Sequence, residues 1–205
     1  MIKHIIFGFL LISILTTSFC QDSSFIKVHF LYGSKPRSKY KETESKWFGG
    51  ILGGHVGIEC NTDEIINFLP AGNVHWFEQP DEIQSSFKIH SRASFYKIFS
   101  SSDDSIKKAI VIIPVSKRQK IKFDSLSQIY LTESPYDYAF FGMRCGAAAY
   151  DILSQMEILE PLSHSKNWRK IFYPKKFREQ LFTKAHENNW EVIKMEGSSK
   201  RKWER

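Results

Sequence analysis

From residue 25 to residue 115, apolar and polar residues mostly alternate with a period of two, which is the pattern of half-buried strands. Clusters of Gly, Pro, Asn, Asp and Ser separate the alternating runs and predict turns between them. Strands are therefore expected at residues 25–33, 55–60, 64–69, 74–77, 88–99 and 109–115. Pro114 has no backbone N–H to donate, so the last of these strands is expected at a sheet edge, or with Pro114 near its end.

After residue 115 the pattern becomes helical. Helices are expected at residues 116–131, 145–159 and 174–190, and Pro174 suits the first turn of the last one. The segment 134–138, which contains Pro135, separates the first two helices. Strands followed by helices favour an α+β architecture, in which an antiparallel sheet packs against helices.

Residues 1–20 have the pattern of a secretory signal peptide. A short basic start precedes an apolar run over residues 5–15, which is too short to span a bilayer comfortably, and a small polar stretch ends at Cys20. The alternative is a lipid anchor on Cys20 at the mature N-terminus. Phe19 argues against it, because lipoprotein processing wants a small residue before the cysteine. The sequence thus predicts export to the periplasm, the cell envelope or the exterior.

The rest of the chain suits one domain, expected over residues 25–190, with a basic tail at 191–205. A content of 17 Phe, 8 Tyr and 5 Trp suits a compact core. Losing Lys3 with the signal lowers the formal net charge from +7 to +6, which favours anionic surfaces but fits a solvated surface equally. A nucleic-acid partner is not expected, because the exported chain carries no recognisable binding motif.

Two segments suggest thiol chemistry. In Gly53-Gly54-His55-Val56-Gly57-Ile58-Glu59 a histidine lies between glycines at the start of an expected strand. In Phe141-Gly142-Met143-Arg144-Cys145-Gly146-Ala147-Ala148-Ala149 a cysteine begins an expected helix of small residues. A thiolate nucleophile needs a base, and a helix N-terminus favours negative charge and can bind an oxyanion. Cys145 is therefore the candidate nucleophile and His55 the candidate base.

The cysteine pattern leaves two other interpretations open. Cys60 and Cys145 are an even pair in an oxidising compartment, so a structural disulfide between them is a serious alternative. Against it, Cys60 does not share the strand face of His55. A zinc site built from His55, His75 and the two cysteines is the other alternative, although the sequence has no CxxC or HExxH spacing.

A histidine base needs a third group to orient it. With three loop residues after Cys60, the expected hairpin sets Asn67 opposite Gly57 and diagonal to His55 on the same face. Asn67 is also awkward in an otherwise apolar strand unless its amide has partners. His75 competes for this role. Glu59 is expected on the same strand face as His55 and could line the cleft, but a strand carboxylate of this kind is more often simply solvated.

His55 on an early strand, Asn67 on the next and Cys145 at a later helix start together resemble the circularly permuted branch of the papain-like NlpC superfamily. That branch includes lecithin retinol acyltransferase-like enzymes and bacterial envelope cysteine hydrolases. The resemblance covers residues 25–159. It implies a permuted papain-like fold, in which Cys145 is the nucleophile, His55 the general base and Asn67 the orienting residue. The departure is at Asn67, where the acyltransferase members commonly carry histidine.

The resemblance further implies thioester chemistry without a metal or organic cofactor. The expected function is an exported cysteine hydrolase of an amide or peptide bond, with a cell-wall peptide as first substrate and a lipid acyl ester or amide as second. A non-catalytic envelope binding protein is the alternative from another class. Trp47 and Phe48 could wall the cleft, and residues 136–138 could contribute to a substrate pocket or simply close a loop. The basic tail could touch a membrane or partner, although most such tails are solvated.

Overall fold

The structure is a computed structural model that describes residues 24–44, 53–61, 63–98 and 105–204. The expected signal peptide at 1–20, Cys20 and the pair Trp47 and Phe48 lie outside these residues. In chain order the elements are β1 (Ser24–Leu31), β2 (Ser34–Pro36), the 3₁₀ helix η1 (Ser38–Tyr40), β3 (His55–Asn61), β4 (Glu64–Pro70), β5 (His75–Phe77), β6 (Ser85–Ser91), α1 (Arg92–Lys97), β7 (Lys108–Val115), α2 (Lys117–Thr132), β8 (Ala139–Phe141), α3 (Cys145–Gln155), α4 (His164–Lys170), α5 (Pro174–Glu187), β9 (Glu191–Met195) and β10 (Arg201–Trp203).

The fold is α+β, as the sequence predicts, and is built on a six-stranded antiparallel sheet in the order β6-β4-β3-β1-β7-β9. The expected β3–β4 hairpin is present in the expected register, with Gly57 opposite Asn67. Pro114 lies near the end of β7, beyond Ile112 where pairing with β9 stops. An interior strand therefore tolerates Pro114, since only β1 pairs beside it.

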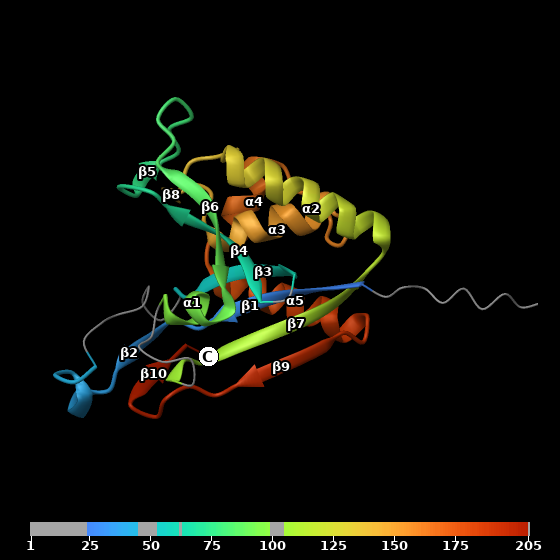
Figure 1. Cartoon of the computed structure of the whole chain (residues 1–205). Coiled ribbons are helices and arrows are strands. Elements are labelled where there is room, and N and C mark those ends of the chain that lie inside the picture. Colours follow the sequence, from blue (N-terminus) through green and yellow to red (C-terminus); the bar gives the residue numbers. More distant parts are fainter. Residues whose placement is uncertain (1–23, 45–52, 62, 99–104, 205) are drawn as a thin grey trace, which may run out of the picture.

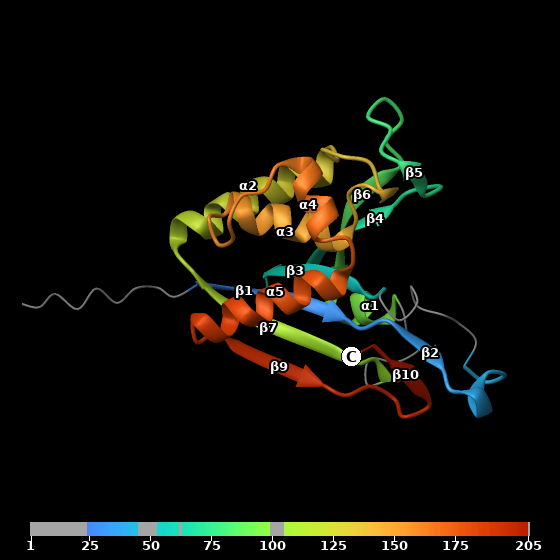
Figure 2. The same ribbon diagram turned by 180° about the vertical axis from the view of Figure 1, so that it is seen from behind.

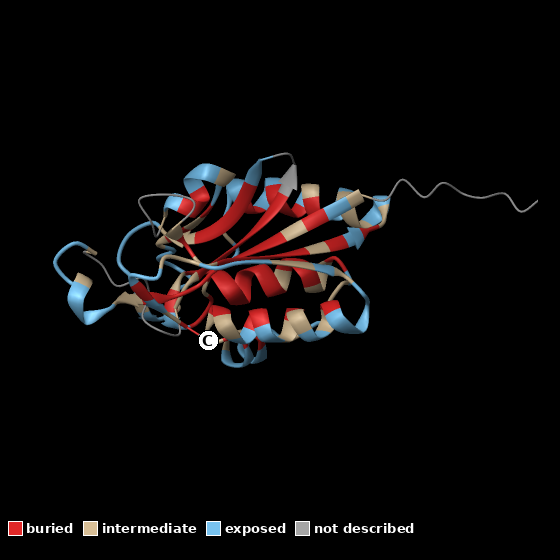
Figure 3. Cartoon of the chain, turned by 90° about the horizontal axis from the view of Figure 1, so that it is seen from below, coloured by how far each residue is buried: buried red, intermediate tan, exposed pale blue. Residues whose placement is uncertain are grey.

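Helices cover both faces of this sheet unequally (Figures 1 and 2). Helices α2, α3 and α5 pack on one face, where the main core includes Val28, Val56 and Ile66. On the other face the short helix α1 packs on β4 and β6, over a smaller core that contains Phe95. Figure 3 shows the buried residues concentrated along the sheet and on the helix surfaces turned toward it. No helix in the described ranges is both long and apolar enough to cross a membrane.

The expected strand at 88–99 is wrong over its second half. Strand β6 ends at Ser91, and residues 92–97 form α1. The cause is a helix cap, because the Ser91 side chain accepts a hydrogen bond from the Ser94 backbone N–H. Phe95 and Tyr96 are then buried against the sheet by the helix rather than by strand alternation.

The C-terminal residues are structured, in contrast to the solvated basic tail expected at 191–205. Strand β9 is the sixth strand of the main sheet, and β10 pairs with β2. Glu204 is buried and forms an ion pair with Arg178 of α5 at 2.5 Å. Burial of such a pair ties this segment to the domain. The expected strand at 74–77 is also placed differently, since β5 pairs in parallel with β8 and not with the main sheet.

Candidate active site

Cys145 is the first residue of α3 and only 3% of its surface is exposed. The helix has no side-chain cap from the preceding residue, Arg144, because a guanidinium has no acceptor for the helix N–H groups. The first-turn N–H groups therefore take no cap from that residue, and they lie beside the thiol. Gly146 and the alanines after it let the helix pack closely; a Cβ on Gly146 would meet the Pro174 backbone at 3.3 Å.

His55 begins β3 and is buried, with its backbone opposite Leu31 of β1. Gly54 immediately before it has a φ of +89°, and a Cβ there would lie 2.1 Å from the Leu31 carbonyl oxygen. Only glycine fits this turn. The glycine beside the histidine thus sets where the strand begins and brings the imidazole to the start of α3.

The His55 ring lies between Cys145 and Asn67. Its Nε2 is 2.9 Å from the Asn67 Oδ1, and the ring also hydrogen-bonds the Cys145 thiol. The orientation of the Asn67 amide is fixed by its Nδ2, which donates to the Lys88 carbonyl oxygen at 3.1 Å. Oδ1 must then accept from His55 Nε2–H, which leaves Nδ1 for the thiol. The geometry unites the three residues that the sequence singled out.

The electrostatics favour a charged pair. Burial alone would raise the pKa of Cys145, but the charge and hydrogen bond of His55 outweigh it, and the pKa of the thiol is lowered. The Val56 backbone N–H and the Arg144 charge act in the same direction. Burial opposes the charge of His55 too, but Cys145 and the hydrogen bond to Asn67 raise the pKa of the imidazole. Thiolate and imidazolium stabilise each other here.

Tyr138 is a site residue that the sequence did not single out beyond a loop-closing or pocket role. Its hydroxyl hydrogen-bonds both the Cys145 side chain and the Cys145 backbone N–H. Burial, followed by the neighbouring Cys145 charge, raises the pKa of Tyr138 well above its usual range, so the hydroxyl keeps its proton. The Tyr138 oxygen therefore accepts from the Cys145 backbone N–H, and the Tyr138 O–H donates to the Cys145 sulfur. The contact is made by the turn between Tyr138 and Met143, which form an isolated β-bridge, and periodicity does not predict such a turn.

His90 and Phe95 complete the surroundings of the imidazole. The Asn67 Nδ2 is 2.8 Å from His90 Nδ1, so His90 accepts this hydrogen bond and is neutral. Burial and the charge of His55 lower the pKa of His90 in agreement with that role. The Phe95 ring lies 5.5 Å from the His55 ring, centroid to centroid. The sequence missed both because β6 and α1 were expected as a single strand.

His75 is not part of this cluster. Its Nδ1 lies 2.6 Å from the Asp137 Oδ2, and the buried Asp137 also accepts the backbone N–H groups of Gln79 and Gln84. Next to it, Glu78 accepts the Met143 backbone N–H at 2.5 Å. These carboxylates fix the loop before the nucleophile helix. His75 therefore helps to hold that loop, and Asn67 is the residue that hydrogen-bonds His55.

Glu59 does not line the site. It is buried and pairs with His29, Lys27 and Arg92 at 2.9–3.0 Å. Burial opposes its charge, but the hydrogen bonds from His29, Arg92 and Lys27 hold the pKa of Glu59 well below its usual range. The carboxylate is therefore the centre of a structural ion-pair cluster. Neither expectation for it, a cleft residue or a solvated strand residue, is correct.

Cys145 carries a free thiol in the part of the chain that the structure describes. The Cys60 side chain lies outside that description. Among the same residues, no group of three or more His, Cys, Asp or Glu side chains is arranged to hold a metal ion.

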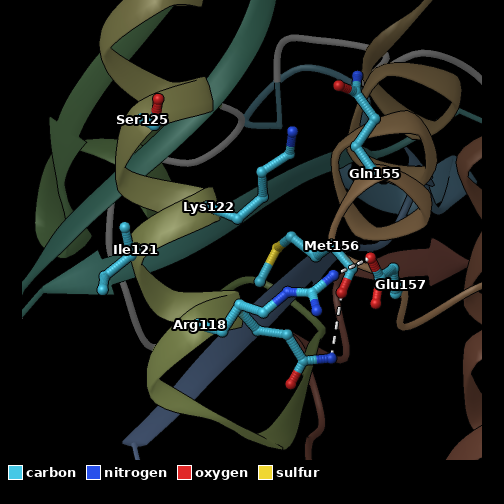
Figure 4. A pocket seen from close by; sticks show the side chains of 8 residues that line it. Arg118, Ile121, Lys122, Ser125, Gln155, Met156 and Glu157 are labelled. Carbon is cyan, nitrogen blue, oxygen red and sulfur yellow. Dashed lines mark hydrogen bonds and ion pairs between the residues drawn. The ribbon is translucent and has the colours of Figure 1, made fainter.

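A cavity of about 450 Å³ lies elsewhere, between α2 and the end of α3 (Figure 4). Its lining includes Arg118, which pairs with Glu157 at 2.6 Å, and Gln119, which donates to the Met156 carbonyl oxygen. It adjoins the opposite end of α3 from Cys145. The cavity is a surface depression closed by an exposed ion pair, and we assign it no role in the chemistry of the thiol.

An exposed group of five aromatic side chains, here called the aromatic platform, lies beside the nucleophile helix. Trp76 and Phe77 come from β5, Phe140 and Phe141 from β8, and Phe172 from the α4–α5 connection. Neighbouring rings are 4.9–6.4 Å apart between centroids. Trp76 and Phe77 are 69% and 68% exposed. Figure 1 shows β5 and β8 projecting together from the sheet near α4. Such an apolar group on a surface is typical of a binding site.

Comparison of the chain with protein-family models, curated proteins and solved structures finds no match. Functional interpretation therefore depends on the geometry of the site.

Proposed function

We propose that this protein is an exported thiol hydrolase that cleaves an amide or peptide bond, with a cell-wall peptide as first substrate class, through a thioester on Cys145. The observation that carries the proposal is the His55 ring held between the Cys145 thiol and the Asn67 amide. Histidine, asparagine and cysteine occur in this order on β3, β4 and the start of α3. That order is the basis for proposing a permuted papain-like fold of the NlpC type.

In the proposed reaction His55 acts first as an acid and then as a base. The Cys145 thiolate attacks the substrate carbonyl carbon. As the sulfur loses its charge, the Tyr138 hydroxyl and the Cys145 N–H leave their hydrogen bonds at the resting thiol and donate to the oxyanion. The C–N bond breaks as the His55 imidazolium gives its proton to the leaving amine. Water, deprotonated by His55, then attacks the thioester; the C–S bond breaks and the carboxylic acid leaves. An alcohol or amine in place of water would give acyl transfer.

The test is the rate at which iodoacetamide labels the thiol of the mature chain between pH 5 and 9. The lowered thiol pKa predicts fast labelling that persists below pH 7, whereas an ordinary thiol with a pKa of about 8.5 slows tenfold for each pH unit below that value. A Cys60→Ala variant assigns the label to Cys145. A rate that follows an ordinary thiol, or a chain without free thiol, would contradict the proposal and favour a non-catalytic binding protein.

A lipid acyl ester or amide is the second candidate substrate, and the aromatic platform favours it. Exposed Trp and Phe side chains enter the boundary between headgroups and acyl chains readily. Arg169 and Lys170 in the last turn of α4, close in sequence to Phe172, suit anionic headgroups. With a lipid substrate, the aromatic platform would dock on a membrane surface and present an acyl chain to Cys145.

Sedimentation with phospholipid vesicles checks this candidate. Trp76→Ala combined with Phe77→Ala is expected to lower vesicle binding at least several-fold, because the two most exposed aromatic rings of the platform are lost. The matched control is Ile121→Ala with Ile129→Ala, which removes exposed apolar side chains from α2 instead. Equal vesicle binding by both double variants and the wild type would favour the peptide substrate.

A further inference from the structure

Arg144, which directly precedes the nucleophile, has a guanidinium group with unused hydrogen-bond donors. Its Nε and Nη2 atoms are buried and have no hydrogen-bond partner among the described residues. Such donors cost free energy when they are removed from water unpaired, and a buried guanidinium without an acceptor costs more. Paired groups are the rule in protein interiors, so these two donors point to a missing acceptor.

The surroundings of Arg144 are aromatic. The guanidinium carbon lies 4.1 Å from the centre of the Phe172 ring, 5.3 Å from that of Tyr173 and 5.5 Å from that of Phe140. Cation–π contacts of this kind hold a guanidinium by its face and leave the N–H groups at its edge free for another partner.

No carboxylate of the described chain neutralises this group. The charges that act on Arg144 come from Tyr138, Cys145 and Tyr173. Glu78, which stands beside the loop before Arg144, is committed to the Met143 N–H and to His164. Among the described residues the cation is therefore held by aromatic rings, and the Cys145 thiolate, not a carboxylate, is the protein anion that acts on it.

We propose that Arg144 binds an anionic group, a carboxylate or a phosphate, carried by the substrate close to its scissile carbonyl. The inference deepens the proposed function and rests on it. A planar guanidinium fork fits the paired oxygens of either anion. Phe140, whose ring centre lies 5.5 Å from the guanidinium carbon, is 37% exposed, so the group lies close to the molecular surface at this point. The substrate class is thus an amide or ester with an anionic substituent and an apolar part that lies on the platform.

Two alkylating reagents of nearly equal size test this pairing without knowledge of the substrate. Iodoacetate carries a carboxylate and iodoacetamide is its neutral counterpart. The ratio of their rates at Cys145 is expected to be about tenfold higher than for free cysteine, as one charge-assisted hydrogen-bonded contact predicts. Arg144→Gln should return the ratio to that of free cysteine, and Arg144→Lys, which keeps charge but not the fork, should retain part of the preference.

The alternative is that Arg144 only lowers the pKa of the thiol. Arg144→Gln would then slow both reagents equally and leave their ratio unchanged, and that result would overturn the proposal. The ratio can be measured at any absolute rate. If Cys145 of the wild type reacts slowly with both reagents, the proposed function is contradicted. If Arg144→Gln leaves the ratio of the two rates unchanged, the role of Arg144 is contradicted.

Protection against iodoacetamide distinguishes the two anions. Acetate and inorganic phosphate are added separately to the wild type and to Arg144→Gln. The expected result is slower labelling of the wild type by one of them, lost in the variant, and the effective anion identifies a carboxylate or a phosphate. Failure of both anions to protect the wild type would contradict the proposal.

Discussion

Replacing His55 by alanine is expected to slow labelling of Cys145 by iodoacetamide by up to about 100-fold at pH 6.5. Without the imidazolium, burial is left to act on the thiol, and its pKa returns to the ordinary value of about 8.5 or above. At pH 6.5 about one thiol in a hundred is then ionised. Hydrolysis should fall further, by about 10²–10⁴-fold for the base and acid steps, because His55 also protonates the leaving group. Release of p-nitrophenol from p-nitrophenyl acetate measures this second effect.

The matched control for His55→Ala is His75→Asn. Asparagine keeps a donor for Asp137, and His75 has no contact with the thiol, so labelling should stay at the wild-type rate. Thermal melting of both variants separates loss of chemistry from loss of fold. A His55→Ala protein that melts as the wild type does and still labels fast at pH 6.5 would remove the base from the proposed mechanism.

Register made the pairing of His55 and Asn67 predictable. In the structure Asn61 pairs with Glu64, and a register shift between Glu59 and Asn61 restores the pairing of Gly57 with Asn67 that a three-residue connection predicts. Period-two alternation then puts the imidazole and the amide on one face. The strand face of Asn67 also carries Ile65 of the smaller core, so an amide there needs the three hydrogen-bond partners that it finds, one donor and two acceptors. The alternation depends on local sequence alone, and it was sufficient to place Asn67 on the face of His55.

Other parts of the site depend on contacts between distant segments, which periodicity does not report. The β5–β8 ribbon is parallel and joins residues more than sixty positions apart. It assembles the aromatic platform. Likewise, Arg144 reads as an ordinary surface cation until Phe172 is found against it. Helix α1 was missed for a local reason, because the cap at Ser91 outweighs an alternation that continues past it.

Contacts between distant segments also explain why the prediction for the C-terminal segment was wrong. Its basic composition predicts a solvated tail, but composition does not show that Arg201 donates to Ser34 at 2.8 Å or that Glu204 pairs with Arg178. Arg201 also forms an ion pair with Glu44 at 2.8 Å, so the charge of each buried residue is compensated by a partner elsewhere in the chain. Charged residues near a terminus are therefore a poor guide to disorder in this protein.

Replacing Tyr138 by phenylalanine separates two roles of the residues around the thiol, stabilising the thiolate and stabilising the oxyanion. Alkylation passes through no oxyanion, whereas attack on a carbonyl does. Loss of the Tyr138 hydroxyl is therefore expected to slow acylation by p-nitrophenyl acetate about 10²–10³-fold, the usual cost of one oxyanion donor. Labelling by iodoacetamide should change much less, because His55 and the Val56 N–H still support the thiolate.

The control for Tyr138→Phe is Tyr136→Phe, two residues earlier. The Tyr136 hydroxyl is buried without a hydrogen-bond partner in the described part of the chain, so its removal should affect neither rate. Equal slowing of alkylation and acylation by Tyr138→Phe would mean that the hydroxyl acts on the thiol and not on the oxyanion. Selective loss of acylation would instead show that the Tyr138 hydroxyl, with the Cys145 N–H, binds the oxyanion. Stabilising the charge that develops on the carbonyl oxygen is where transition-state stabilisation has its largest effect.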